Sequence, residues 1–136
     1  GRAHYLVFDI TRSFDIYEKS GINFDSTCSF SDAVGFRFGT SKPFRPYNFV
    51  ENREYNVVEI PLIIMDDSLQ SPRYVNLTPD EKFEKIKKMI DKVGKYNGTF
   101  TFLWHNSSFY VTEWRGWEWI YDETIKCLKE NNFEFI

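Results

Sequence analysis

Histidine and aspartate side chains directly follow three of the apolar segments that the sequence presents as strands. His105 follows TFTFLW, Asp25 follows INF, and Asp66 and Asp67 follow VVEIPLIIM. In α/β folds with parallel strands, active sites gather at the carboxyl ends of the strands. Imidazole titrates near neutral pH and a carboxylate can fix its tautomer, so these residue types at one rim can do general acid–base chemistry.

Each of these residues also has an ordinary structural explanation. Strands need polar residues where they turn, and this role is preferred for Asp66 and Asp67. For Asp25 the structural and functional interpretations stay equally open. His105 is one of only two histidines and stands at the sharpest strand end, so a functional role is preferred for it. The other histidine, His4, lies within the apolar run HYLVF and is interpreted as a core residue.

Other kinds of active site find less support in the sequence. Ser107 and Ser108 lie close to His105, but the G-x-S-x-G motif of serine hydrolases is absent. Phosphate-binding glycine motifs and the H-x-x-x-H and H-E-x-x-H metal motifs are absent too. Cys28 and Cys127 have neither zinc-knuckle nor disulfide-framework spacing.

The apolar pattern predicts strands that alternate with helices. The expected order is a strand at 4–8, a helix at 11–19, strands at 22–24 and 57–65, a helix at 78–97, a strand at 99–104, a helix at about 116–131 and a strand at 133–136. A capping box at Thr78 and Glu81 marks the start of the middle helix. Pro61 indicates an irregularity in its strand, and residues 29–56 are expected to form a long ordered loop. This order favours an α/β fold with mainly parallel strands.

The composition limits the class of protein. A length of 136 residues suits a single domain over residues 1–136. The formal net charge is −3 without a basic stripe, so nucleic acid is not an expected partner. No apolar run approaches the roughly 20 residues that cross a bilayer, so no membrane span is expected. Cytoplasmic and cell-envelope locations both stay open.

Six strings stand in a definite order along the chain. They are GRAHYL at 1–6, FDST at 24–27, GFRFGT at 35–40, PF at 43–44, EIPL at 59–62 and LWHNSSF at 103–109. In this order and spacing they resemble the later part of polysaccharide deacetylases of the NodB-homology class, closest to a bacterial branch of deacetylase-like proteins. The resemblance runs from Arg2 to about Leu128.

The resemblance implies a distorted β/α barrel, of which this chain would be the C-terminal portion, and a hydrolase that cleaves the N-acetyl amide bonds of amino sugars. In such enzymes a divalent metal, zinc or a similar ion, activates water. A histidine in a Leu-x-His motif protonates the departing amine, and Leu103 to His105 (LWH) matches it, so His105 would be the general acid. Arg2 resembles the arginine that holds the catalytic base, and Asp25 resembles the acidic residue that orients the acid histidine.

The chain departs from the family pattern at two of these positions. Arg2 is followed by Ala-His instead of x-Pro, and Asp25 begins DSTCS instead of D-x-x-D-W. The family's Asp-Asp pair and histidine pair precede the arginine motif, so the base and the metal ligands are expected upstream, and this chain alone is expected to bind no metal. A partial barrel would leave an unpaired edge at residues 4–8, from which self-association is expected.

Three hypotheses about function follow. The first is a metal-dependent hydrolase acting on acylated amino-sugar polysaccharides or oligosaccharides, of which the isolated chain would be inactive. The second is a carbohydrate-binding relative without catalysis, and the third is a structural domain. Arg37, between Gly35 and Gly39, and Trp104 are predicted to contact substrate. Stacking on sugar rings is the alternative to ordinary packing for the aromatic residues Phe36, Phe38, Phe44, Trp104 and Trp114.

Overall fold

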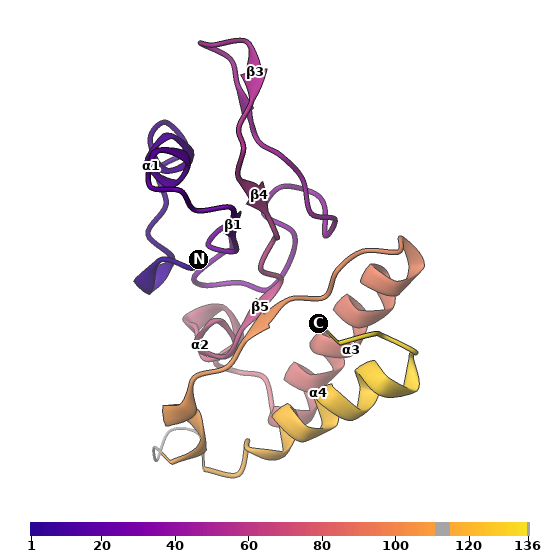
Figure 1. Ribbon diagram of the computed structural model, residues 1–136. Coiled ribbons are helices and arrows are strands. Elements are labelled where there is room, and N and C mark those ends of the chain that lie inside the picture. The colour runs from indigo at the N-terminus through magenta and orange to yellow at the C-terminus, as the bar shows by residue number, and fades with distance from the viewer. Residues whose placement is uncertain (111–114, 136) are drawn as a thin grey trace.

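The computed structural model describes residues 1–110 and 115–135, and within them the fold is mixed α/β with short parallel strands and no closed barrel (Figure 1). The strands form three sheets of two strands each. The pairs are β1 (Phe24–Asp25) with β4 (Val58–Glu59), parallel; β5 (Ile64–Met65) with β6 (Phe102–Leu103), parallel; and β2 (Tyr47–Asn48) with β3 (Arg53–Glu54), antiparallel. The predicted α/β class with mainly parallel pairing is confirmed at this level.

The α-helices are α1 (Ser13–Lys19), α2 (Asp66–Leu69), α3 (Pro79–Lys95) and α4 (Trp119–Glu130), and the 3-10 helices are η1 (His4–Leu6), η2 (Pro72–Tyr74) and η3 (Asn106–Phe109). Three α-helices fall close to the segments predicted as helices, at 11–19, 78–97 and about 116–131, whereas α2 and the 3-10 helices were not predicted. The predicted capping box begins α3: the Thr78 hydroxyl accepts from the Glu81 amide, and the Glu81 carboxylate accepts from the Thr78 amide.

The main core lies between the β5–β6 pair and the two long helices. Apolar residues recur along α3 at helical spacing, so one face of this helix is apolar and turns inward. In Figure 1, α3 and α4 lie side by side next to this pair of strands. The buried members of this core are Ile63, Ile64, Leu69, Ile86, Ile90, Ile120 and Leu128.

The apolar run at 57–65 changes its partner at Pro61. The Ile60 amide donates to the Asp25 carbonyl, whereas the Ile63 amide donates to the Thr101 carbonyl. Proline has no amide hydrogen to donate to a neighbouring strand, which explains why pairing stops there. One run of sequence therefore supplies both β4 and β5, and it joins the two parallel pairs.

Two predicted strands are wrong. Tyr5 and Leu6 have φ values of 57° and 52°, in the left-handed region, so residues 4–6 form a turn of 3-10 helix instead of an extended edge. His4, expected in the core, is exposed. At the other end, the Phe133 amide donates to the Leu128 carbonyl, and the ring packs on the core instead of joining a sheet. Residues 4–6 therefore do not form the strand edge on which the predicted self-association was based. Self-association itself stays a prediction.

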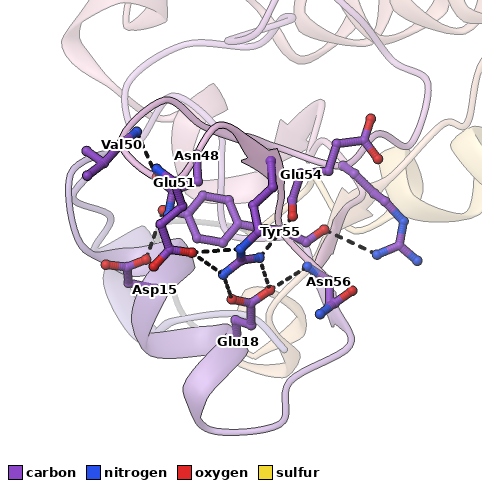
Figure 2. A network of polar contacts seen from close by, with 10 residues as sticks. Asp15, Glu18, Asn48, Val50, Glu51, Glu54, Tyr55 and Asn56 are labelled. Carbon is purple, nitrogen blue, oxygen red and sulfur yellow. Dashed lines mark hydrogen bonds and ion pairs between the residues drawn. The ribbon is translucent and has the colours of Figure 1, made fainter.

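The predicted long loop at 29–56 contains the hairpin of β2 and β3. Figure 2 shows how polar groups attach this hairpin to α1. The Arg53 guanidinium donates to both carboxylate oxygens of Glu18, at 3.0 and 2.7 Å, and to Glu51 at 2.7 Å. Glu18 also accepts from the Asn56 amide at 2.7 Å. Tyr55 completes the contact by donating from its hydroxyl to Asp15 at 2.9 Å.

Candidate active site

The carboxyl ends of β5 and β6 bring Asp66 and His105 together. The two strands are parallel neighbours, with Met65 opposite Leu103. Asp66 is the next residue after β5 and begins α2, while His105 lies two residues after β6 and caps η3. Parallel pairing in this register places both residues at the same edge, which is where α/β folds assemble active sites.

Asp66 is a fully buried carboxylate whose two oxygens accept four hydrogen bonds. Oδ1 accepts from His105 Nδ1 at 2.6 Å and from the Asp67 amide at 2.9 Å. Oδ2 accepts from the His105 amide at 2.6 Å and from the Ser108 hydroxyl at 2.6 Å. A carboxylate has about four lone-pair positions, so these donors satisfy it completely. Asp66 therefore holds His105 through both its ring and its backbone.

This arrangement defines what the imidazole can do. Because Asp66 Oδ1 is an acceptor, Nδ1 carries the hydrogen, and Nε2 is the ring nitrogen that can exchange a proton with a ligand. The His105 side chain is 37% exposed while that of Asp66 is 0% exposed. The pair thus has the form of a general acid or base whose tautomer is fixed by a buried carboxylate.

Asp67 is the third charged group at this edge. Its Oδ2 lies 3.8 Å from His105 Nδ1, and its side chain is 60% exposed. Partial desolvation and then the repulsion of Asp66 raise the pKa of Asp67, against the attraction of His105. Asp67 is therefore harder to ionise than an isolated aspartate, and its carboxyl group lies beside the imidazole.

Asp66, Asp67 and His105 place three potential metal-ligand atoms within 4.8 Å of one another. However, the hydrogen bonds of Asp66 already occupy all of its lone-pair positions and engage the Nδ1 atom. An ion bound to Nδ1 and Asp66 would have to displace the 2.6 Å contact between them. The three side chains are arranged as a hydrogen-bonded pair with a neighbouring carboxylate, and they do not fit a divalent metal in this geometry.

The nearby serine is not positioned as a nucleophile. The Ser108 side chain is buried and donates its hydroxyl to Asp66. A serine nucleophile would instead donate to the imidazole nitrogen that removes its proton. Ser108 therefore serves to complete the set of donors around Asp66, in agreement with the absence of a serine-hydrolase motif.

A second group of charged residues lies at the β1–β4 pair. Asp25 and Glu59 are directly opposite each other in the register, and they are 2% and 0% exposed. Asp25 accepts from the Thr27 amide and hydroxyl, both at 2.9 Å. The guanidinium of Arg2 donates to the carbonyl and the hydroxyl of Ser26, both at 3.0 Å. Burial lowers the pKa of Arg2, and the attraction of Asp25 and Glu59 offsets part of that shift.

Glu59 is the more unusual member of this group. Its Oε1 accepts from the Cys28 amide at 3.2 Å, while Oε2 meets no donor group within the part of the chain that the structure describes. Burial, followed by the hydrogen bond and the repulsion of Asp25, raises the pKa of Glu59 to about 8. Glu59 is therefore mainly protonated at neutral pH and can share its proton with Asp25. Burial and the repulsion of Glu59 also raise the pKa of the Cys28 thiol, so it is no ready nucleophile.

The structure places the predicted site residues in two groups. His105 lies in the first, and the carboxylate on its Nδ1 is Asp66, whereas the resemblance had given that contact to Asp25. Arg2 and Asp25 lie in the second, where Asp25 is the neighbour of Glu59. The turn role preferred for Asp66 is incomplete, because this residue begins α2 and also orients the histidine.

The two predicted substrate contacts have structural partners. Arg37 donates to the Ser29 carbonyl at 2.8 Å, and its guanidinium lies 5.8 Å from the ring centre of Phe8. Trp104 packs against the main core, with its ring centre 5.8 Å from that of Tyr121. Contact with a substrate stays a prediction for both residues.

The other described aromatic residues for which stacking on sugar rings was the alternative also pack against neighbouring residues. Phe36 packs on the main core, and Phe38 meets Phe44 edge to face at 5.3 Å between ring centres. Trp114 lies outside the described residues. Packing therefore accounts for the described members of the set.

Sequence reasoning did not identify Glu59 or Ser108 as members of these groups. Glu59 stands inside the apolar string EIPL, where a single charged residue in a buried run is itself a sign of a polar contact in the interior. Ser108 offered no comparable signal, because its hydrogen bond to Asp66 spans 42 positions of sequence.

No protein-family model, curated protein or solved structure matches the chain.

Proposed function

We propose that this chain belongs to a hydrolase that cleaves the acetamide bond of N-acetylated amino sugars, with His105 as its general acid. The observation that carries the proposal is the 2.6 Å contact between His105 Nδ1 and the buried carboxylate of Asp66, at the carboxyl ends of two parallel strands. The Leu-x-His motif that resembles polysaccharide deacetylases supplies the substrate class.

The chemistry assigned to His105 is a single proton transfer. In hydrolysis of an acetamide, water adds to the carbonyl carbon, the C–N bond breaks and the amine leaves as its nitrogen gains a proton. Protonated Nε2 gives that proton to the departing nitrogen, while Nδ1 keeps its hydrogen bond to Asp66. Asp66 stabilises the imidazolium before transfer and preserves the ring orientation after it.

The fold proposed with this function is the later portion of a distorted β/α barrel. The two parallel strand pairs, joined through the segment that changes partner at Pro61, support it. The divalent metal implied by the resemblance would activate water, and Asp66, Asp67 and His105 do not fit it. The roles proposed for the residues of this chain therefore do not involve a metal.

The test is release of acetate from N-acetylated chito-oligosaccharides by the longest natural form of the protein that contains this chain, with Zn²⁺ or Co²⁺ added. The informative variant is His105→Asn, because the asparagine amide can still donate to Asp66 while Nε2 is lost. We expect a loss in kcat of about a hundredfold or more, as for removal of a general acid. His4→Asn is the matched control, because His4 is the other histidine and is exposed.

The two possible failures are informative. If His105→Asn retains acetate release at the level of His4→Asn, His105 is not the acid. If the unmodified protein releases no acetate but binds the oligosaccharide in calorimetry, the chain is a binding relative and the proposal of catalysis is wrong.

A further inference from the structure

A cavity of about 630 Å³ lies between the end of α3 and the loop that follows Phe36. Three lysines line it: Lys92 and Lys95 from the last turns of α3, and Lys42 from the loop. None of the described lining residues is acidic. This is a local excess of positive charge in a chain whose formal net charge is −3.

The positive charge has an ordinary explanation for two of these residues. Lysines in the last turn of a helix interact favourably with the helix dipole, and this accounts for Lys92 and Lys95. It does not account for Lys42, which comes from a different segment and faces the same cavity. Three lysines that line one cavity repel one another, and an anion bound between them would reduce this repulsion.

The loop wall of the cavity is held in place by its own backbone. Gly39 has a φ of 71°, a conformation that favours glycine, and its amide donates to the Phe36 carbonyl at 3.0 Å. The Lys42 amide donates to the Thr40 hydroxyl at 3.0 Å, and the Ser41 carbonyl accepts from the Thr99 amide at 3.0 Å. The backbone that carries Lys42 is therefore held in place by hydrogen bonds of the protein itself.

Two aromatic rings complete the lining. Phe36 is half-buried, while Tyr96 is 64% exposed, and Lys95 Nζ lies 5.6 Å from the centre of its ring. A large exposed ring beside cations suits a ligand that has both a charged group and a flat apolar face. A sugar ring that carries a carboxylate or phosphate has both features.

We propose that this cavity binds a negatively charged sugar, its anionic group between Lys42, Lys92 and Lys95 and its ring against Tyr96. The site is separate from His105, because the lining residue Ser41 pairs with Thr99, which precedes β6, while His105 follows that strand. The inference is therefore independent of the proposed hydrolysis, and binding can be present whether or not acetate is released.

The test is titration of the 136-residue chain with trigalacturonate, followed by NMR of backbone amides, in about 20 mM and about 200 mM salt. Glucosamine 6-phosphate, neutral chitotriose and inorganic phosphate are the comparison ligands. We expect the charged sugars to shift the amides of Gly39, Lys42 and Lys95, more weakly at the higher salt, and chitotriose to leave them unchanged. Stronger binding of trigalacturonate or of the phosphosugar identifies the anionic group as carboxylate or phosphate.

Two variants separate charge from stacking. Lys92→Glu with Lys95→Glu should weaken binding of the charged sugars by about tenfold or more. The matched control is Lys126→Glu with Lys129→Glu, an exposed pair with the same spacing near the end of α4. Tyr96→Ala should weaken binding of the sugars but leave that of inorganic phosphate unchanged.

Three results would overturn the proposal. They are equal binding of chitotriose and trigalacturonate, unchanged affinity in the Lys92 and Lys95 double variant, and sugar binding that survives Tyr96→Ala at full strength. Each contradicts a different part of the assignment, namely the charge of the ligand, the lysines that bind it or the ring on which it stacks.

Discussion

Glu59 on β4 and Asp66 directly after β5 are both fully buried carboxyl groups, yet their surroundings are opposite. Asp66 accepts four hydrogen bonds, three of them at 2.6 Å. Glu59 accepts one, from the Cys28 amide at 3.2 Å, and has Asp25 as its neighbour. Burial alone does not determine the state of a carboxyl group, because the donors around it can replace the water that it has lost.

The consequence is a division of roles between the two groups. Around Asp66, the donors come from His105, Ser108 and the start of α2, so the carboxylate fixes an imidazole in place. Around Glu59, a second carboxyl group takes the place of donors, so Glu59 holds its proton more tightly than an exposed glutamate does. Only the first arrangement prepares a side chain to exchange protons with a ligand.

Asp66→Ala should have the largest effect on stability of the variants considered. It removes the acceptor of four hydrogen bonds and leaves buried donors without a partner, at a cost of about 4 kcal/mol in the free energy of unfolding. Urea denaturation measures this change. Asp67→Ala is the matched control, because its side chain is 60% exposed and should change stability by less than about 0.5 kcal/mol. Equal costs for the two variants would show that the Asp66 hydrogen bonds do not hold this edge together.

Glu59→Gln should change the pH dependence of stability. The pKa of Glu59 is raised to about 8 in the folded state, from an ordinary 4.5, so the native state binds the proton more tightly than the unfolded state. Its contribution is complete below pH 4.5 and is lost as pH rises through 8. Glutamine imitates the protonated acid, since its amide can donate to Asp25 and its carbonyl can accept from the Cys28 amide.

Urea denaturation between pH 5 and pH 8 tests this prediction. The unmodified chain should lose about 3 kcal/mol relative to Glu59→Gln over that interval, because each unit of pKa shift corresponds to about 1.4 kcal/mol. Glu54→Gln, at an exposed position on β3, removes the same charge and should leave the pH dependence as it was. Parallel pH profiles of Glu59→Gln and the unmodified chain would mean that Glu59 is ionised in the folded state.

Local signals in the sequence predicted part of the fold and one residue of the candidate site. The capping box at Thr78 predicted the start of α3, and Pro61 predicted the interruption between β4 and β5, because both depend on neighbouring residues. His105 was predicted from its place after an apolar strand. Its link to Asp66 spans 39 positions, and it depends on which strands are neighbours, which the sequence pattern does not specify.

The failures share a physical cause. Residues 4–8 have the composition of a strand, but an edge strand forms only where a partner accepts its hydrogen bonds, and here Tyr5 and Leu6 adopt left-handed backbone angles instead. Likewise Glu59 looked like part of an apolar run, because the sequence shows its neighbours but not Asp25 across the β1–β4 pair. Propensity indicates what a segment can form, and pairing decides what it does form.

The Glu18–Arg53 contact supplies an exposed counterpart to the two buried carboxyl groups (Figure 2). Hydrogen bonds from Arg53, and then from the Asn56 amide, lower the pKa of Glu18 to about 2 against a small desolvation. The stabilisation is therefore present above the ordinary pKa of 4.5 and is lost as pH falls through 2, the reverse of the dependence for Glu59. Glu18→Gln should lower the melting temperature slightly at pH 7 in low salt.

Melting curves from pH 7 to pH 2 test the sign of this effect. The difference between Glu18→Gln and the unmodified chain should shrink as Glu18 gains its proton, and it should shrink also with added salt, because the pair is exposed. Glu123→Gln is the control, since Glu123 pairs with Lys126 only at 3.4 Å within α4, and among the described residues it has no backbone donor of the kind that Asn56 provides to Glu18. A difference that is as large at pH 3 as at pH 7 would mean that the uncharged contacts of Glu18, and not its ionised carboxylate, attach the hairpin to α1.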